Sequence, residues 1–252
     1  MAYTLAVFSD IHSNIVALDT VLEDIESQFS EVTEYLCPGD LVGYGPNPRE
    51  VLQRVFKEEK LVAISKGNHD HGVGLGRGGN STHYQKYVKK FNSFAQEAIR
   101  WHVELLTSEE KNNLYRLPSS QTCLHKGYKT QITLIHGSPE YPLDEYVFPG
   151  SQQQKSLFPF MELFEVGVLL LGHTHIPFVD TMESENGPLL MCNPGSVGQP
   201  RDRDPRASYA VIDMDECSAE IIRVEYDIPK VQGDILSAGL PTYLAERLAK
   251  GK

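Results

Sequence analysis

The sequence predicts an α/β protein in which two β-sheets pack together and helices flank them. Two observations favour this fold class. Over residues 3–65, apolar segments with strand character alternate with helical periodicity, which is typical of a largely parallel sheet covered on both faces. From residue 119 onward, strand-like segments follow one another mostly through short turns, which indicates more antiparallel pairing.

The first half of the chain begins with an apolar strand over residues 3–9. A helix follows it, because Ser13 or Asn14 is a suitable N-cap and apolar side chains recur at helical spacing from Leu18 to Ile25. A second helix opens at Pro48, since proline is favoured in the first turn. The remaining elements of this half are strand 32–37, helix 48–59 and strand 61–65.

Residues 72–118 depart from this alternation. The glycine-rich run over 72–79 lacks the Gly-Lys-Ser/Thr of a phosphate loop and does not directly follow a strand, so we expect a flexible hinge or lid. A basic helical segment follows over 84–101, and Thr107 and Glu110 then match a capping box. We therefore expect a small helical cap insertion over the carboxyl ends of the strands.

Strands return after this cap, and a helix over residues 152–164 breaks the series, with Pro159 as a candidate interruption. A C-terminal helix is expected over 241–250, and we expect residues 1–252 to form a single domain. The expected strands of this half cover residues 119–125, 130–136, 166–171, 176–181, 188–193, 207–213 and 219–225.

Composition and charge exclude several classes of protein. The chain has 252 residues, of which 40% are hydrophobic and 23% charged, as in an ordinary globular protein. The mean hydropathy is −0.31, the apolar stretch over 166–171 is too short to span a bilayer, and no secretion leader is visible, so we expect a cytoplasmic protein. The net charge of −11 argues against stable binding to nucleic acid or to anionic membranes. The four cysteines have no zinc-site or disulfide-type spacing.

Five short blocks carry histidine, Asp and Asn, and nearly every block follows an apolar run that ends abruptly. Several strands are therefore expected to deliver these side chains to one edge of a sheet. Carboxylate oxygen and imidazole nitrogen suit hard divalent first-row cations. The blocks predict a dinuclear metal site, with Asp40 as the best carboxylate to bridge two cations about 3.5–4 Å apart. The blocks are Ser9-Asp10-Ile11-His12, Gly39-Asp40, Gly67-Asn68-His69-Asp70, Ile135-His136-Gly137 and Gly172-His173-Thr174-His175.

In order and approximate spacing, these blocks resemble the calcineurin-like metallophosphoesterase superfamily over about residues 5–200. The resemblance implies a four-layer αββα sandwich of two mixed sheets flanked by helices. It also implies two divalent metal ions, for which manganese is the first candidate and iron, zinc, nickel or cobalt are alternatives. The implied ligands of one ion are Asp10, His12, Asp40 and His175, and those of the other are Asp40, Asn68, His136 and His173.

One departure from the family pattern indicates which branch of the superfamily this chain resembles. The protein phosphatases and dinucleoside tetraphosphate hydrolases of the family continue the second block as Gly-Asp-x-x-Asp-Arg-Gly, in which the arginine holds the phosphoryl group. This chain has Gly-Tyr-Gly-Pro over residues 43–46, which looks more like the small prokaryotic phosphodiesterase-type members, as does the segment 193–201. Arg201 and Arg203 are the candidates for the missing phosphate clamp, and Tyr44 is a further candidate substrate contact.

The predicted activity is hydrolysis of phosphate esters, with phosphodiesters as the first expectation, through in-line attack of a metal-bridging hydroxide. His69 is in excess of the ligand count and is the candidate general acid, with Asp70 orienting its ring and Asn68 donating to the phosphoryl oxygens. The alternatives are a phosphomonoesterase, a nucleotide pyrophosphatase or a non-catalytic scaffold of this fold. The expected partner is a small phosphorylated substrate, and the oligomeric state stays open, a homo-oligomer included.

The remaining histidines and basic residues are expected to have ordinary roles. Four histidines are expected at ordinary core or surface positions: His71, His83, His102 and His125. For His71 and His83, contact with the substrate from the cap is the alternative. Four basic residues of the cap are expected to form a solvated face, with steering of an anionic substrate as the alternative: Arg77, Lys86, Lys89 and Lys90. Trp101 is expected to anchor the cap helix. Substrate preference is expected to depend on the cap and on loops 138–150 and 195–206.

Overall fold

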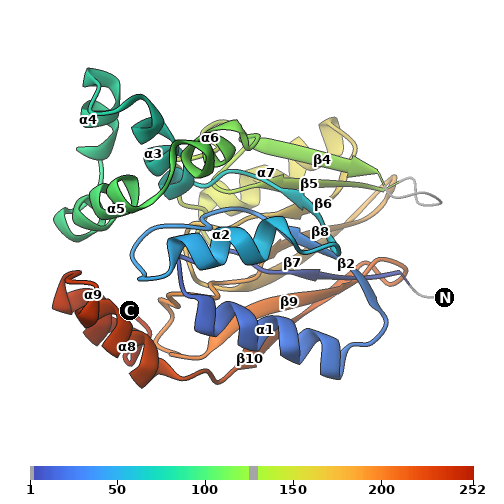
Figure 1. Cartoon of the computed structure of the whole chain (residues 1–252). Coiled ribbons are helices and arrows are strands. Elements are labelled where there is room, and N and C mark those ends of the chain that lie inside the picture. Colours follow the sequence, from blue (N-terminus) through green and yellow to red (C-terminus); the bar gives the residue numbers. More distant parts are fainter. Residues whose placement is uncertain (1–2, 125–129) are drawn as a thin grey trace.

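The protein is a four-layer sandwich in which two sheets pack face to face between layers of helices (Figure 1). The computed structural model describes residues 3–124 and 130–252, so His125 lies outside the described residues. Within these ranges each sheet contains five strands, and both sheets mix parallel and antiparallel pairs. The predicted fold class is confirmed.

The first sheet has the strand order β10-β9-β1-β2-β3. The pairs β1–β2 and β2–β3 are parallel, as the alternation of strands and helices predicts, while β9 pairs antiparallel with both β1 and β10. The late strands thus return to complete the sheet that the early strands begin. The strands are β1 (Thr4–Val7), β2 (Val32–Cys37), β3 (Leu61–Ile64), β9 (Ala207–Asp213) and β10 (Ser218–Val224).

The second sheet has the strand order β4-β5-β6-β8-β7. Its central pairs β5–β6 and β6–β8 are parallel, and the outer pairs β4–β5 and β7–β8 are antiparallel. All seven strands that the sequence predicts for this half are present, and five of them form this sheet. They are β4 (Ser120–Leu124), β5 (Gln131–Ile135), β6 (Val166–Leu170), β7 (Phe178–Ser184) and β8 (Gly187–Asn193).

Three apolar layers hold the sandwich together. Between the sheets, side chains such as Leu5 and Leu36 of the first sheet pack with Leu134 and Leu170 of the second. Helices α1 (Ile15–Gln28) and α2 (Pro48–Phe56) cover the outer face of the first sheet, and α7 (Gln152–Leu163) covers that of the second. The Asn14 side chain caps α1 by accepting from Ala17 N at 3.0 Å, and Pro48 stands in the first turn of α2 as predicted.

The glycine-rich run is helical, so the expectation of a flexible hinge is wrong. Residues 68–75 form α3 and residues 76–78 a short 3₁₀ helix. The reason is close packing: a Cβ on Gly74 would lie 2.8 Å from the backbone nitrogen of Tyr115, so only glycine lets α3 approach α6. The cap consists of α3 (Asn68–Leu75), η1 (Gly76–Gly78), α4 (Thr82–Val88), α5 (Ser93–Leu105) and α6 (Ser108–Arg116).

The basic segment of the cap is two helices where the sequence analysis predicts one. The chain leaves α4 at Lys89 and starts α5 after Asn92, whose side chain accepts from Ala95 N at 3.0 Å. By contrast, Thr107 and Glu110 form the predicted capping box of α6. The break between α4 and α5 carries Lys90, which pairs with Asp144 in the loop that follows β5.

Two further helical expectations differ from the structure. Pro159 stands inside α7 without ending it. The helix α8 (Ile228–Ser237) is absent from the sequence prediction, although Asp227 caps it and proline stands in its first turn. It pairs with α9 (Thr242–Leu248), which lies within the predicted C-terminal helix.

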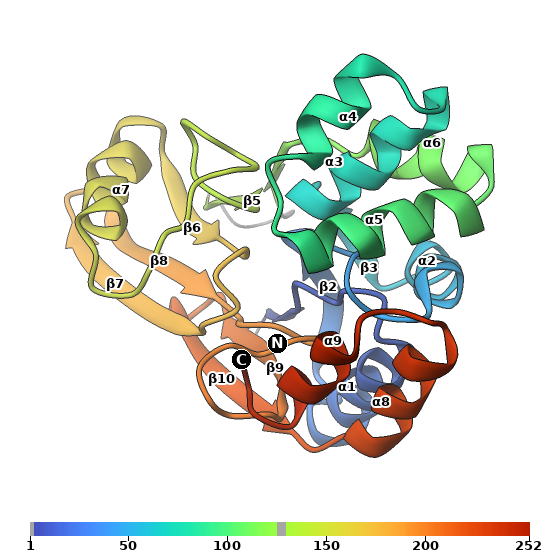
Figure 2. The ribbon, with the colours of Figure 1, turned by 90° about the vertical axis from the view of Figure 1, so that its left-hand side faces the viewer.

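The ends of the parallel strands define the functional end of the molecule. Figures 1 and 2 place the cap helices and the pair α8–α9 at this same end of the sandwich. The loops that follow β1, β2, β3, β5 and β6 carry the five histidine-containing or acidic blocks. Among the helices that the structure describes, none combines the length and the apolar character needed to cross a bilayer.

Candidate metal centre

The structure brings all seven candidate metal ligands together, although their blocks are far apart in sequence. Each of these side chains is buried. Their donor atoms form overlapping groups able to hold a metal ion, such as Asp10 with His12 and His175, and Asp10 with Asp40 and His136. Burying carboxylates and imidazoles away from water costs free energy, and a cation bound between them would offset this cost.

The geometry of His12 and His175 gives the most direct test of whether a cation fits. Their Nε2 atoms lie 3.0 Å apart, and His175 Nε2 lies 3.1 Å from Asp10 Oδ1. The Nδ1 atom of each ring faces a backbone carbonyl oxygen, that of Val42 at 3.0 Å and that of Gln199 at 2.6 Å. A neutral imidazole that donates through Nδ1 carries its lone pair on Nε2. Two such lone pairs repel each other unless a cation lies between them, so this donor set fits a metal ion.

A second set of donors lies beside the first. His136 Nδ1 lies 3.0 Å from the carbonyl oxygen of Pro38, which leaves its Nε2 facing Asn68 Oδ1 at 3.2 Å. The ring of His173 lies 4.9 Å from that of His136, and its Nε2 is buried without a hydrogen-bond partner in the described structure. A buried, unpartnered imidazole nitrogen beside an amide oxygen is suited to metal ligation.

Asp40 lies between the two sets. Its Oδ2 atom is 3.6 Å from Nε2 of His12 and 3.3 Å from Nε2 of His136. Its other oxygen accepts from the backbone nitrogen of His69 at 2.9 Å, which fixes the carboxylate plane. The position agrees with the bridging role that the sequence analysis gives to Asp40.

The titration behaviour of the buried cluster follows from this arrangement. Burial opposes the ionisation of Asp40, but the neighbouring histidines outweigh it and hold the pKa of the carboxyl well below its usual range. Burial would lower the pKa of His136, but Asp40 raises it to about 9. Burial, reinforced by His175, holds the pKa of His12 far below its usual value. The cluster therefore combines ionised Asp40 with neutral His12, the forms that bind metals, whereas His136 releases a proton when a metal binds.

The backbone is strained at the same place. Non-glycine residues with positive φ are uncommon, and they persist where packing over-determines them, often at functional sites. Five of the seven candidate ligands have this conformation: Asp10 (54°), His12 (47°), Asp40 (54°), His173 (69°) and His175 (58°).

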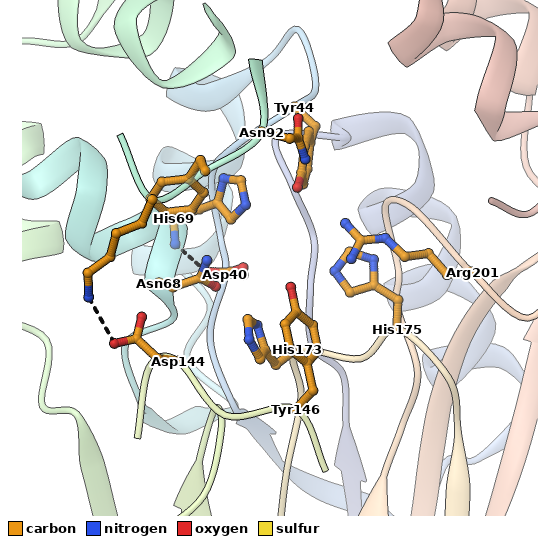
Figure 3. Close-up of a pocket in the computed structure, with 12 residues that line it drawn as sticks. Asp40, Tyr44, Asn68, His69, Asn92, Asp144, Tyr146, His173, His175 and Arg201 are labelled. Carbon is orange, nitrogen blue, oxygen red and sulfur yellow. Dashed lines mark hydrogen bonds and ion pairs between the residues drawn. The ribbon is translucent and has the colours of Figure 1, made fainter. Parts of the chain in front are cut away.

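A pocket of about 180 Å³ opens onto this cluster (Figure 3). The sequence analysis does not name several of the residues that line this pocket. It covers them only as parts of the cap and of the loop 138–150. Tyr146 stacks on the ring of His173, with ring centres 3.8 Å apart and planes 17° apart. The lining residues are Asp40, Tyr44, Asn68, His69, Lys90, Phe91, Asn92, Asp144, Tyr146, His173, His175 and Arg201.

His69 lies in this pocket against aromatic rings. Its ring centre is 4.4 Å from that of Tyr44 and 4.8 Å from that of Phe91. A Cβ on Gly43 would lie 2.3 Å from Nδ1 of His69, and Gly43 also has a φ of +103°, so glycine is required beside the ring. Burial lowers the pKa of His69 to about 3, and Asp40 only partly opposes this effect. His69 is therefore a neutral imidazole in the free pocket.

Asp70 does not orient the His69 ring as the sequence analysis predicts. Its carboxylate accepts instead from the backbone nitrogens of Val42 at 3.1 Å and Gly67 at 3.0 Å. The reason is its place in the first turn of α3, where an acidic side chain satisfies the free amide groups of the helix start. Asp70 thus joins the loop after β2 to the start of α3, and it acts on His69 only through the backbone.

The three predicted substrate contacts differ in position. Arg201 and Tyr44 line the pocket, with the guanidinium carbon of Arg201 5.5 Å from the Tyr44 ring centre. The Nε of Arg201 is buried without a partner among the described residues, so this arginine can still bind an anion. Arg203 does not line the pocket, and its backbone nitrogen donates to Gly251 O at 2.9 Å.

His102 supports the pocket from the cap. The sequence analysis assigns it an ordinary position, and it is fully buried in α5. Its Nδ1 accepts from Gly43 N at 3.2 Å, and its Nε2 lies 2.9 Å from the carbonyl oxygen of Gly45. His102 therefore holds both ends of the turn that carries Tyr44, and it does so as the neutral Nε2-protonated tautomer.

We expect the stability at acid pH to depend on His102. Burial lowers its pKa from 6.5 to about 4, partly opposed by the hydrogen bond to Gly45. Because the folded pKa is below the unfolded one, the contribution is complete above pH 6.5 and is lost as the pH falls toward 4, by about 3 kcal/mol in all. Urea unfolding at about pH 7 and about pH 4.5 should show a smaller loss in His102→Gln than in the wild type. Equal losses would contradict this role.

The fold and the donor cluster agree with the protein family that the sequence matches. The sequence profile of the calcineurin-like phosphoesterase superfamily domain matches residues 3–217. The chain belongs to the calcineurin-like phosphoesterase superfamily. As a member, it is a metal-dependent hydrolase that acts on phosphate esters.

Individual proteins are similar to this chain over nearly its whole length. An uncharacterized protein of Methanocaldococcus jannaschii is 38% identical over 264 aligned residues, which cover 98% of each chain. The crystal structure of a metallophosphoesterase from Sphaerobacter thermophilus is similar with a TM-score of 0.78, at 32% identity and with 100% of both chains covered. That of a hypothetical protein from Pyrococcus horikoshii has a TM-score of 0.84, at 25% identity and with 99% of both chains covered.

Proposed function

We propose that this phosphoesterase hydrolyses phosphodiesters of small molecules with a pair of divalent cations, for which Mn²⁺ is the first candidate. One observation carries the proposal. His12 and His175 direct two lone pairs at each other across 3.0 Å, and Asp40 stands between that pair and His136. Two convergent donor sets that share one carboxylate are the arrangement expected of a dinuclear site.

The ligand assignment is as the sequence analysis has it. Asp10, His12, Asp40 and His175 would hold one cation, and Asp40, Asn68, His136 and His173 the other. When bound, such a pair acidifies water and neutralises charge on phosphoryl oxygens. The backbone carbonyl oxygens that face Nδ1 of His12, His136 and His175 keep these rings in the ligating tautomer.

The pocket residues bind and protonate the substrate in this proposal. The Arg201 guanidinium donates from Nη2 to Gln199 Oε1 at 2.9 Å, while its Nε has no partner among the described residues. In this proposal it holds the phosphoryl group, and Asn68 offers its amide nitrogen to the same oxygens while Oδ1 faces the cluster. His69 donates a proton to the leaving oxygen. The phosphoryl anion favours the imidazolium form of His69, which burial disfavours in the free pocket.

The charges of the pocket support a diester over a monoester. The phosphoryl group of a diester carries one negative charge, and that of a monoester carries two near neutral pH. Two cationic side chains line the pocket. One is Arg201, and the other, Lys90, is already paired with Asp144 at 3.1 Å. Arg201 has no carboxylate partner among the described residues, so its one positive charge matches the one phosphoryl charge of a diester.

Turnover of matched aryl esters tests the proposal. After separate loading with Mn²⁺, Fe²⁺, Zn²⁺, Ni²⁺ or Co²⁺, the protein is expected to hydrolyse bis-p-nitrophenyl phosphate with a higher kcat/KM than p-nitrophenyl phosphate. A preference for the monoester would favour the phosphomonoesterase alternative. Cleavage of nucleoside diphosphates ahead of both aryl esters would favour a nucleotide pyrophosphatase.

A further inference from the structure

The wall of the pocket opposite Arg201 contains an ion pair between two parts of the chain. Lys90 lies in the break between α4 and α5, and Asp144 lies in the loop that follows β5. Their Nζ and Oδ2 atoms are 3.1 Å apart, and both residues line the pocket. In Figure 3, Asp144 and Arg201 stand on opposite sides of Asp40. A phosphodiester bound between these two walls would therefore direct one substituent toward the ion pair.

This ion pair can exchange partners at little cost. The Lys90 side chain is 55% exposed and that of Asp144 is 53% exposed. Exposed pairs of this kind contribute about 0.2–1 kcal/mol, because water already solvates both charges. An anionic group of a substrate can therefore replace Asp144 as the partner of Lys90 without a large loss of stability.

The surroundings favour an anion over a cation at this place. The Lys90 ammonium lies 5.0 Å from the ring centre of Tyr87, which helps to hold it when Asp144 withdraws. The Asp144 carboxylate has no hydrogen-bond or ion-pair partner other than Lys90 among the described residues, so no second contact of this kind holds it.

We infer that Lys90 and Asp144 form an exchangeable pair that selects phosphodiesters carrying a second anionic group, a carboxylate or a phosphate, on the substituent that faces the cap. Lys90 binds that group, and Asp144 competes for Lys90. The inference rests on the proposed phosphodiesterase function and names the class of substrate within it. Selectivity is the difference between the binding free energies of an ester with the second anion and an ester without it. Lys90 makes this difference larger by attracting the anion, and Asp144 makes it smaller by competing for Lys90.

A matched pair of substrates isolates this effect. Butyl p-nitrophenyl phosphate and 3-carboxypropyl p-nitrophenyl phosphate have the same leaving group and the same chain length, and only the second has a carboxylate. The ratio of KM for the carboxypropyl ester to KM for the butyl ester is the readout. Hydrolysis of the butyl ester by the wild type reports the proposed function separately, because it does not involve a second anion.

The two substitutions are expected to shift this KM ratio in opposite directions. Asp144→Asn frees Lys90 and should lower the ratio by about three- to fivefold, whereas Lys90→Gln leaves an unpaired carboxylate and should raise it by a similar factor. The double variant should bring the ratio close to one. The matched controls Lys89→Gln and Glu140→Gln remove exposed charges beside each partner and should leave the ratio at the wild-type value.

The outcomes separate the two proposals. Butyl ester that stays intact after metal loading would contradict the proposed function, and the inference would fall with it. Normal butyl ester turnover with the same KM ratio in both variants would overturn the inference alone. A shift of the same sign in both variants, or a preference for a 4-aminobutyl ester, would also overturn it.

Discussion

Replacing His69 with alanine is expected to lower kcat by about 10²–10⁴-fold while the bound metal content stays the same. The reason is the position of the ring, which lines the pocket but lies outside the two donor sets that share Asp40. The loss should be larger for an alkyl leaving group than for p-nitrophenolate, because a good leaving group departs without a proton. Steady-state kinetics on both ester types measure this difference.

Metal analysis decides between this role and an alternative that the geometry allows. Donor atoms of His69, His12 and Asp40 all lie within 4.8 Å of one another, so His69 itself could hold a cation. Loss of a metal ion in His69→Ala would establish that alternative and contradict the role as proton donor. His71→Ala is the matched control, since His71 is the neighbouring histidine, packs on Tyr87 and does not line the pocket.

Replacing Asp40 with asparagine is expected to remove bound metal and, with it, nearly all activity. Asparagine keeps the size of the side chain and an oxygen for the His69 amide, but it loses the charge that lies 3.6 Å from His12 and 3.3 Å from His136. Changes to outer residues of metal sites already cost about 10–100-fold in metal affinity, so the loss of a shared ligand should exceed about 100-fold.

The control for Asp40→Asn removes the same charge from another part of the pocket. Asp144→Asn changes a carboxylate that lines the pocket but belongs to neither donor set. Metals per chain, measured by elemental analysis after dialysis, should fall in Asp40→Asn and stay at the wild-type value in Asp144→Asn. Retention of two metal ions by Asp40→Asn would contradict the shared-ligand assignment.

The sequence was sufficient to predict the strands and the position of the ligand blocks. Parallel strands present their carboxyl ends at one edge, so the blocks after β1 and β2 meet in the first sheet and those after β5 and β6 meet in the second. Local signals such as the Asn14 cap and Pro48 fixed helix starts, because their effects depend only on adjacent backbone.

Other features depend on contacts between distant segments, and local patterns do not contain them. Glycine is needed at position 74 because the backbone of Tyr115 in another helix lies so close. Composition does not show this contact, so the glycine-rich run suggested a hinge. Tyr146 lies in a loop without periodicity, and its role follows only from its stacking on His173. Two local signals were nevertheless present and unused: Asn92 as an N-cap, which splits the cap helix, and Asp70 in the first turn of α3.

The pairing of two cations at Asp40 is tested most directly by anomalous diffraction from crystals of the protein loaded with Mn²⁺. Two peaks are expected about 3.5–4 Å apart, with the Asp40 carboxylate in contact with both and with Asp10 and His136 on opposite sides. A single peak, or two peaks that do not share Asp40, would contradict the dinuclear site.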